Sequence, residues 1–325
     1  MALSAVFMGT PQFAATILQK VLDSSLVTVK AVYTQPDRPA GRGKALKASE
    51  VKELALVHGL PVLQPLRFAE PGAVETLAAF KPDLLLVAAY GLILPQRVLD
   101  IPLLYPLNVH ASLLPRYRGA APIQRAVMAG DTVTGVTIMK MEAGLDSGPM
   151  MLQQAMGIGI NDTAGQLHIE LAEAGAALLL ESIKRISEGR EQLTQQESLK
   201  VSVAPKLTKE EGLVDFSRSV AEVHAHIRGV TPWPGARLVL KREGQEDLFL
   251  TAEPGPYPFH ALSLPPFAAD EGTPGAIGGL AEGTLLVRCK DGYYAFSSLR
   301  PAGKKAMTGQ SFYNGYLASA SAARF

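Results

Sequence analysis

In the first part of the chain, short apolar runs alternate with stretches whose apolar residues recur at helical spacing. These runs predict strands at residues 5–8, 26–33, 62–63, 84–88, 107–110, 133–139 and 150–158. Residues 84–88 are continuously apolar, which is typical of a strand buried on both faces. Helices are expected over residues 11–22, 49–58 and 163–188. The repeated alternation of strand and helix predicts an α/β fold with a doubly wound sheet.

Residues at the helix ends support these limits. Thr10 is predicted to be the N-cap of the first helix, with Pro11 in its first turn, where the missing N–H costs nothing. Gly59 and Gly189 follow the second and the last of these helices, where glycine accepts the left-handed conformation that often ends a helix.

The pattern changes after residue 189. Residues 190–205 are polar and without periodicity, so they are predicted to be a linker. Beyond it, one helix near residues 220–228 leads into short β segments separated by Gly, Pro and acidic turns. This pattern predicts a small, OB-like β-barrel over residues 206–325, after an α/β domain over residues 1–189. Trp233, between two prolines, is expected to anchor the barrel core, with RNA stacking as the alternative.

Composition narrows the functional classes. A chain of 325 residues, 47% hydrophobic and 19% charged, is typical of a globular protein with two domains. The formal net charge is +1, so any contact with nucleic acid must come from a local basic patch. The single cysteine, Cys289, cannot form an internal disulfide and fits a reducing compartment. With neither a signal peptide nor a membrane span evident, we expect a cytoplasmic protein and no membrane partner.

Polar side chains of possible catalytic use stand together in the stretch NVHASLLPRYRGAAP, residues 108–122. Asn108 and His110 are two apart on a strand, so they face the same side at its end, where open α/β sheets bind ligands. An amide and an imidazole aimed at one point can stabilise an oxyanion, and the imidazole can move a proton. The alternative is that both side chains only cap the strand end.

A carboxylate is expected to join this pair. Asp146 lies in the glycine-flanked loop GLDSG, after the strand predicted at residues 133–139. If the loop returns to the same sheet edge, Asp146 fixes the tautomer of His110 and stabilises its charged form. Amide, imidazole and carboxylate without Ser or Cys indicate transfer to a substrate that brings its own nucleophile. An ordinary turn at Asp146 remains the alternative.

The stretch NVHASLLPRYRGAAPI, together with GLDSG, resembles the signature of the folate-dependent formyltransferases. The resemblance implies a Rossmann-like formyltransferase domain, a 10-formyltetrahydrofolate co-substrate and no metal. It implies that Asn108, His110 and Asp146 are catalytic. It also implies a folate site bordered by Ser112, Leu113, Leu114, Pro115, Tyr90, Gly91 and Leu92.

Two features bear on the acceptor of the formyl group. The run TQPDRPAGRGKALK, residues 34–47, is cationic and rich in Gly and Pro, as a flexible phosphate-contacting loop would be. It resembles the tRNA-facing insertion of the family branch that acts on initiator methionyl-tRNA, and Arg42 matches the arginine that probes the acceptor stem there. IRGVTPWPGA and LRPAGKKAM resemble the C-terminal barrel of that branch. The implied tRNA contacts are Arg38, Arg42, Lys44, Lys206, Lys304 and Lys305.

Three alternatives stay open at this point. The cationic run is solvated surface if it has no phosphate partner. An amino-sugar nucleotide is the other acceptor, served by the same chemistry. A non-catalytic RNA-binding protein on the same fold is the third. We expect a monomer in each case. His224 and His226 lie in a helical pattern about 200° apart, so a shared metal ion is not expected.

Overall fold

The computed structural model describes residues 2–40, 45–260, 272–318 and 323–325. It forms two compact units. Unit 1 comprises Met1–Pro122, Thr134–Met156 and His168–Ala204, and unit 2 comprises Ile123–Val133, Gly157–Leu167 and Pro205–Phe325. Unit 2 therefore includes two short segments from the first half of the chain. The domain limits expected at residues 189 and 206 stay predictions.

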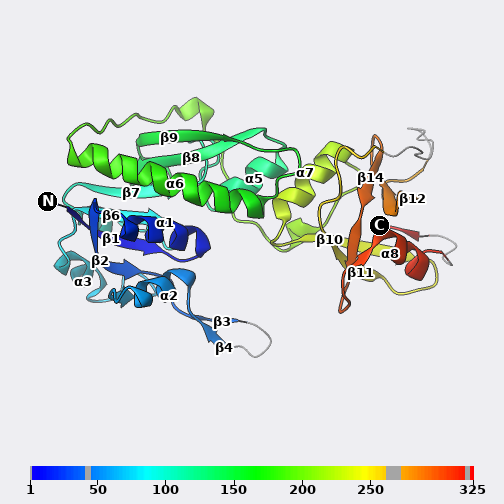
Figure 1. The fold of residues 1–325 in the computed structure, drawn as a ribbon, viewed down its shortest axis with the longest axis horizontal. Helices are drawn as coiled ribbons and strands as arrows, with labels where there is room; N and C mark the ends of the chain where they lie inside the picture. Colours follow the sequence, from blue (N-terminus) through cyan, green and yellow to red (C-terminus); the bar gives the residue numbers. More distant parts are fainter. Residues whose placement is uncertain (1, 41–44, 261–271, 319–322) are drawn as a thin grey trace. The chain divides into compact units, whose positions relative to one another are not determined.

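A seven-stranded sheet forms the centre of the first unit (Figure 1). Its first five strands in spatial order are parallel, and β8 runs antiparallel to β7. The direction therefore changes at the strand that carries Asn108 and His110. The order across the sheet is β5 (Val62–Leu63), β2 (Val27–Tyr33), β1 (Leu3–Gly9), β6 (Leu84–Ala88), β7 (Tyr105–His110), β8 (Val133–Lys140) and β9 (Met150–Gly157).

Helices cover both faces of this sheet. On one face lie α1 (Gln12–Asp23) and α6 (Ala164–Ser187), where Gly175 of α6 packs directly on Val109 of β7. On the other face, a core cluster joins Val6 and Leu85 to side chains of α3 (Ala73–Ala79) and α4 (Gln96–Leu99). The remaining described helix of this unit is α2 (Glu50–Val57).

The seven predicted strands and the three predicted helices are confirmed, within a few residues at each end. Gly59 and Gly189 have φ values of 64° and 63°, which confirms the left-handed ends of α2 and α6. The N-cap prediction for Thr10 is wrong, because Pro11 occupies the cap position. The Thr10 hydroxyl instead donates to the carbonyl of Tyr90, at 2.9 Å, and ties the end of β1 to the segment after β6.

Within the described residues, unit 2 contains two antiparallel sheets and the helices α5 (Pro122–Met128), α7 (Val220–Val230) and α8 (Gly309–Tyr316). The first sheet has the order β16 (Met307–Thr308), β15 (Ser298–Pro301), β11 (Leu248–Ala252), β10 (Ala236–Arg242) and β17 (Ala323–Arg324). The second has the order β12 (Ile277–Ala281), β13 (Thr284–Arg288) and β14 (Tyr293–Phe296). A bridge between Ala276 and Arg324 links them.

The core of unit 2 is aromatic, but Trp233 does not anchor it. Phe216, Tyr294, Phe296 and Phe312 are buried among aliphatic side chains of both sheets. Trp233 is 49% exposed, so the prediction of a core anchor is wrong. Two 3₁₀ turns, Ser198–Lys200 and Glu210–Gly212, complete the described elements outside the sheets and helices. None of the described helices has the length and apolarity needed to span a membrane.

His224 of α7 is a buried histidine whose two ring nitrogens are both occupied. Its Nε2 donates to the Ile160 carbonyl at 2.9 Å, so its Nδ1 accepts from the Tyr294 hydroxyl at 3.1 Å. Burial, together with the nearby Arg228 guanidinium, lowers the pKa of His224 to about 4, against the opposing effect of the hydrogen bond to Ile160. The folded protein therefore keeps His224 neutral, whereas the unfolded chain protonates it below its ordinary pKa of about 6.5.

The depressed pKa of His224 predicts an acid-sensitive unit 2. The stabilisation is fully present above about pH 6.5 and is lost as the pH falls towards 4. Between pH 7.5 and pH 5, wild type should lose about 2 kcal/mol more unfolding free energy than His224→Gln. Denaturant unfolding followed by the fluorescence of Trp233, the single tryptophan, measures this in unit 2. His58→Gln, at an exposed position, is the control, and equal acid losses in wild type and His224→Gln would contradict the assignment.

Candidate active site

The end of β7 presents the predicted amide and imidazole. Asn108 pairs in register with Val87 of β6 and with Met139 of β8, and His110 follows two residues later on the same side of the strand. His110 is 5% exposed. Within the part of the chain that is described, the Asn108 side chain makes no hydrogen bond. Its amide is therefore available to a ligand.

The orientation of His110 is fixed by a backbone carbonyl. Its Nε2 lies 2.9 Å from the carbonyl oxygen of Tyr117, and because a carbonyl only accepts, Nε2 carries a proton. Its Nδ1 faces Asp146, with 3.6 Å between Nδ1 and Oδ2. That distance is an ion-pair contact, longer than a hydrogen bond. The imidazole thus turns its Nδ1 side to the carboxylate, as predicted from the sequence.

Asp146 is held from its carboxylate and from its backbone. Its Oδ2 accepts a hydrogen bond from the Gly119 amide at 2.8 Å. Its φ is 45°, in the left-handed region, which is costly for a non-glycine residue and persists only where neighbours enforce it. The prediction that the loop returns to the end of β7 is confirmed by this geometry.

Tyr117, Arg118 and Gly119 form the turn that joins these groups, which we call the anchor turn. Tyr117 supplies the carbonyl for His110, and Gly119 supplies the amide for Asp146. Tyr117 has a φ of 62° and Gly119 a φ of 122°. A Cβ at Gly119 would also lie 2.7 Å from the Ala204 carbonyl oxygen, so this position requires glycine.

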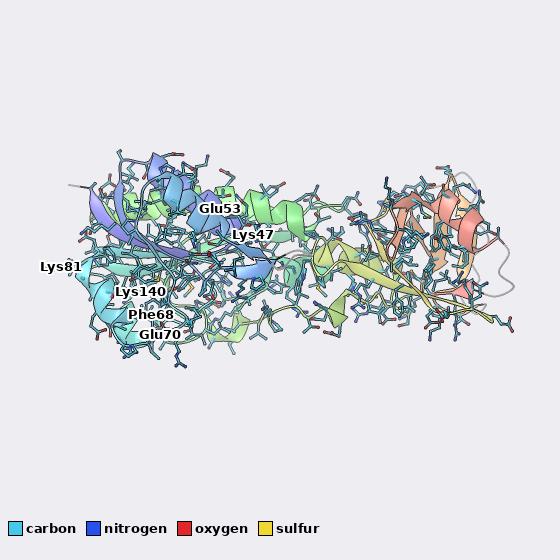
Figure 2. All side chains as sticks on the ribbon, turned by 90° about the horizontal axis from the view of Figure 1, so that it is seen from below. Lys47, Glu53, Phe68, Glu70, Lys81 and Lys140 are labelled. Atoms are coloured by element: carbon cyan, nitrogen blue, oxygen red, sulfur yellow. The ribbon has the colours of Figure 1, made fainter. Side chains whose placement is uncertain are left out.

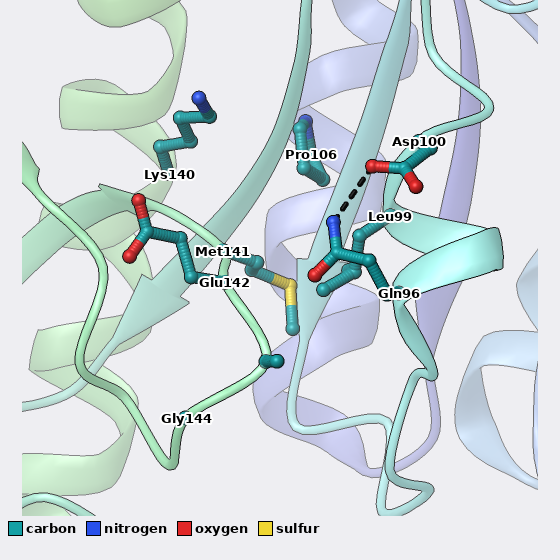
Figure 3. Close-up of a pocket in the computed structure, with 9 residues that line it drawn as sticks. Gln96, Leu99, Asp100, Pro106, Lys140, Met141, Glu142 and Gly144 are labelled. Carbon is teal, nitrogen blue, oxygen red and sulfur yellow. Dashed lines mark hydrogen bonds between the residues drawn. The ribbon is translucent and has the colours of Figure 1, made fainter.

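A pocket of about 480 Å³ is lined by residues that lie close in sequence to Asn108 and Asp146 (Figure 3). One wall comes from α4, where the Gln96 amide donates to the Asp100 carboxylate, and the opposite wall from the segment that leads from β8 towards Asp146. The pocket is lined by Gln96, Leu99, Asp100, Pro106, Lys140, Met141, Glu142, Ala143 and Gly144. Sequence reasoning missed these residues, although several directly precede Asp146 or follow the segment YGLILP, residues 90–95.

The predicted folate-bordering residues fall into three settings. Ser112 is fully buried and donates to the Arg116 carbonyl at 2.6 Å, within the chain that leads to the anchor turn. Leu113, Leu114 and Pro115 line a second pocket of about 620 Å³, together with Met150 and Gln153 of β9.

The YGLILP segment provides the third setting. The Tyr90 side chain is buried in the core beside Phe68, where burial raises the pKa of its hydroxyl. Gly91 has a φ of 84°, and Leu92 packs at the edge of the same cluster. The backbone of this segment therefore lies near α4, while its tyrosine ring faces inwards.

The cationic run forms a hairpin arm rather than the flexible loop expected from its composition. Its strands are β3 (Arg38–Ala40) and β4 (Ala45–Lys47), and Arg38 pairs directly with Lys47. Glu50 and Glu53 of α2 lie close to Lys47 (Figure 2). Arg42 and Lys44 lie outside the described residues.

The run's one acid does not neutralise the arm. Asp37 is paired with Lys52 at 2.6 Å and accepts from Gln64, and both contacts lower the pKa of its carboxyl. Arg38 is exposed, and its only side-chain bond among the described residues is to Gln35. The predicted lysines of unit 2 are all exposed: Lys206, Lys304 and Lys305. The described His, Cys, Asp and Glu side chains form no group suited to a metal ion.

Comparisons with known proteins show the family of the chain. The family model described as formyl transferase matches residues 3–183, more than half of the chain, and that described as formyl transferase, C-terminal domain, matches residues 206–317. The chain belongs to the formyl transferase family.

Full-length relatives narrow the resemblance. The chain is 52% identical over 315 residues to the methionyl-tRNA formyltransferase of Nitratidesulfovibrio vulgaris (strain DP4), covering 97% of this chain and 93% of the relative. It is 46% identical over 309 residues to that of Pseudomonas entomophila (strain L48), covering 95% and 94%.

A solved N-formyltransferase from Helicobacter canadensis, in complex with folinic acid and dTDP-3-aminofucose, superposes with a TM-score of 0.61 at 18% identity. The match covers 93% of this chain and all of that one. At this identity the likeness concerns the fold.

The free amide of Asn108 yields a direct prediction. Asn108→Ala removes one donor for a developing oxyanion and should lower kcat for formyl transfer by about 10²–10³-fold. Binding of folate should change little, because the fold and the pocket walls are kept. Steady-state kinetics and calorimetry with a folate analogue measure the two effects, with Asn161→Ala, at an exposed position, as control. A kcat within a few-fold of wild type would remove Asn108 from the chemistry.

Proposed function

We propose that this protein transfers the formyl group of 10-formyltetrahydrofolate to the amino group of methionyl initiator tRNA. The observation that carries this function is the similarity, at 45–52% identity and over nearly the whole chain, to methionyl-tRNA formyltransferases. The product is N-formylmethionyl-tRNA, which serves translation initiation. The arrangement of Asn108, His110 and Asp146 supplies groups suited to this reaction.

The proposed chemistry uses these groups in order. The methionyl nitrogen attacks the formyl carbon, and the carbonyl electrons move onto the formyl oxygen. The Asn108 amide and His110 Nδ1 donate hydrogen bonds to that oxyanion. Because Nε2–H is engaged by the Tyr117 carbonyl, His110 needs a second proton to donate from Nδ1, and Asp146 balances the resulting charge.

Collapse of the intermediate completes the transfer. The bond between the formyl carbon and N10 breaks, and N10 leaves with a proton. The amine loses a proton in the same sequence, and Asp146 relays it directly or through water to N10. No net redox change occurs, and no metal is needed in this scheme.

We place the folate head group in the pocket between α4 and residues 140–144. Its volume, about 480 Å³, is in the range of small-molecule sites. Pro106 stands two residues before Asn108, and Gly144 stands two before Asp146, so a ligand here lies beside both catalytic segments. The Gln96 and Asp100 side chains offer polar partners to a heterocycle.

The tRNA is assigned to the hairpin arm and unit 2. Arg38 and Lys47 lie directly opposite each other in this hairpin. Lys47 pairs with Glu50 at 2.9 Å. The exposed Arg38, by contrast, bonds only to the neutral Gln35 among the described residues and can offer its charge to a phosphate. Arg42 and Lys44 lie between the two strands of this hairpin in the sequence, and we assign them to tRNA contact as well. In unit 2, Lys206, Lys304 and Lys305 provide exposed cations.

Three finer assignments accompany this function. The two sheets of unit 2 form a small OB-like barrel, which the Ala276–Arg324 bridge between them supports. The protein is a monomer that binds one tRNA. It acts in the cytoplasm, where its buried Cys289, whose pKa burial raises to about 12, remains a thiol.

An amino-sugar nucleotide is the competing acceptor, favoured only by the fold likeness to sugar formyltransferases. The decisive experiment offers 10-formyltetrahydrofolate with initiator methionyl-tRNA, elongator methionyl-tRNA or a dTDP-amino sugar. We expect rapid formylation of the initiator tRNA, weak formylation of the elongator and none of the sugar. Formylation of the sugar nucleotide alone would overturn the proposal.

The lysines of unit 2 give a second test. Replacing both Lys304 and Lys305 with Ala should weaken tRNA binding and reduce the slope of log K against log salt by about two charges. The kcat at saturating tRNA should be unchanged. Filter binding at several salt concentrations measures the slope, with Lys184→Ala, on exposed α6 surface, as control. An unchanged slope would return these lysines to ordinary solvated surface.

A further inference from the structure

Residues 194–204 belong to unit 1, although their polar composition predicts a linker. Thr194 exchanges two backbone hydrogen bonds with Met150 at the start of β9, each 2.8 Å long. At the other end, Val203 bridges to Arg118 of the anchor turn, and the Ala204 amide donates to the Arg118 carbonyl at 2.6 Å. We call residues 194–204 the brace.

The brace also holds the turn that orients His110. The Ser202 hydroxyl accepts from the Tyr117 amide at 2.9 Å, and the Ser202 carbonyl accepts from the Arg118 amide at 2.8 Å. Tyr117 is the residue whose carbonyl binds His110 Nε2. The left-handed backbone of Tyr117 is thus fixed from the brace on one side and from His110 on the other.

Gln196 is the only half-buried residue between Thr194 and Lys200. It is half-buried, whereas its neighbours Gln195 and Glu197 are exposed. Its Nε2 donates to the carbonyls of Asp146 and Gly148, both at 2.8 Å. Its Oε1 accepts from Arg118 Nε at 3.0 Å and from Arg118 Nη2 at 2.8 Å. Both N–H donors and both acceptor positions of the Gln196 amide are therefore used.

These bonds close a ring around the catalytic carboxylate. Gly119 binds the Asp146 carboxylate, Arg118 precedes Gly119 and binds Gln196, and Gln196 binds the Asp146 backbone. Asp146 has the costly left-handed φ of 45°. Gln196 binds the carbonyls of Asp146 and Gly148, on either side of Ser147. A loop so held keeps Oδ2 at a fixed distance from His110 Nδ1.

We propose that Gln196 is a positioning residue for catalysis, which sets the place of the Asp146 carboxylate through the Asp146 backbone and Arg118. This role rests on the proposed formyl transfer through Asp146 and His110. Gln196 touches no reacting atom. The brace leads directly into Pro205, where unit 2 resumes, so the segment that supports the carboxylate also connects the two units along the chain.

Two substitutions separate the contacts of Gln196. Gln196→Glu keeps the size and an acceptor for Arg118 but loses both donors to the Asp146 and Gly148 carbonyls. Gln196→Met keeps the length and loses every hydrogen bond. The matched controls are Gln192→Glu and Gln192→Met. Gln192 is exposed two residues before the brace and makes no side-chain hydrogen bond among the described residues.

Kinetics with 10-formyltetrahydrofolate and initiator methionyl-tRNA should show a loss in kcat alone. Both Gln196 variants should lower kcat by about ten- to hundredfold, the scale on which small misplacements of catalytic groups act. The KM values for both substrates should stay within about threefold of wild type, and the Gln192 variants should behave as wild type. Unchanged kcat in both Gln196 variants would overturn the proposal.

A double-mutant cycle shows whether Gln196 acts through Asp146. In an Asp146→Asn background, which keeps the backbone carbonyl, Gln196→Met should lower the residual kcat by less than about twofold. An equal fold-loss in both backgrounds would mean that Gln196 contributes to stability of the unit rather than to placement of the carboxylate, and would overturn the proposal.

Hydrogen exchange of the Gly119 amide supplies a readout that needs no substrate. This amide donates to Asp146 Oδ2, so its protection should fall in both Gln196 variants while the melting temperature stays near that of wild type. Unchanged Gly119 protection would overturn the positioning role. Absence of formyl transfer in wild type would instead refute the proposed function, with the exchange result still deciding where Gln196 acts.

Discussion

The structure of the site depends on one constraint, the left-handed backbone of the anchor turn. Tyr117 and Gly119 both have positive φ values, and this shape presents the Tyr117 carbonyl to His110 and the Gly119 amide to Asp146. An imidazole at the end of β7 and a carboxylate in a distant loop are brought together because both bind the same turn. The catalytic pair is therefore positioned mainly by backbone groups.

The sheet places the rest of the chemistry around that turn. Asn108 and His110 share a side of β7 because of strand periodicity, at the strand where the sheet changes from parallel to antiparallel. The pocket of about 480 Å³ is built from α4 and from the segment entering the Asp146 loop. Under the proposed function, tRNA recognition belongs to separate parts, the hairpin arm and unit 2, which contribute charge rather than catalytic groups.

Much of this arrangement could be predicted from the sequence. The apolar runs predict the strands. The spacing of Asn108 and His110, together with the glycine-flanked Asp146, indicates the site. What the sequence did not reveal depends on contacts between distant segments. Residues 194–204 are held by single backbone bridges and side-chain hydrogen bonds rather than by a regular strand or helix, so they show no periodicity. A polar segment without periodicity resembles a linker in composition.

The predictions for Thr10 and Trp233 are wrong for similar physical reasons. Thr10 has the residue type of an N-cap, but its hydroxyl is taken by the carbonyl of Tyr90. Trp233 has the size of a core residue, but aromatic side chains from β14, α8 and the loop before α7 fill the core of unit 2. The pocket residues near Asp146 belong to no recognised motif, and their place opposite α4 depends on how the chain folds.

The central claim is that Asn108 and His110 Nδ1 together receive the formyl oxygen beside Asp146. A crystal structure of the protein with a folate analogue that carries a non-transferable formyl group tests this most directly. We expect the formyl oxygen about 3 Å from both the Asn108 amide nitrogen and His110 Nδ1, with the head group between α4 and residues 140–144. A formyl group bound elsewhere, or turned away from both side chains, would contradict the account.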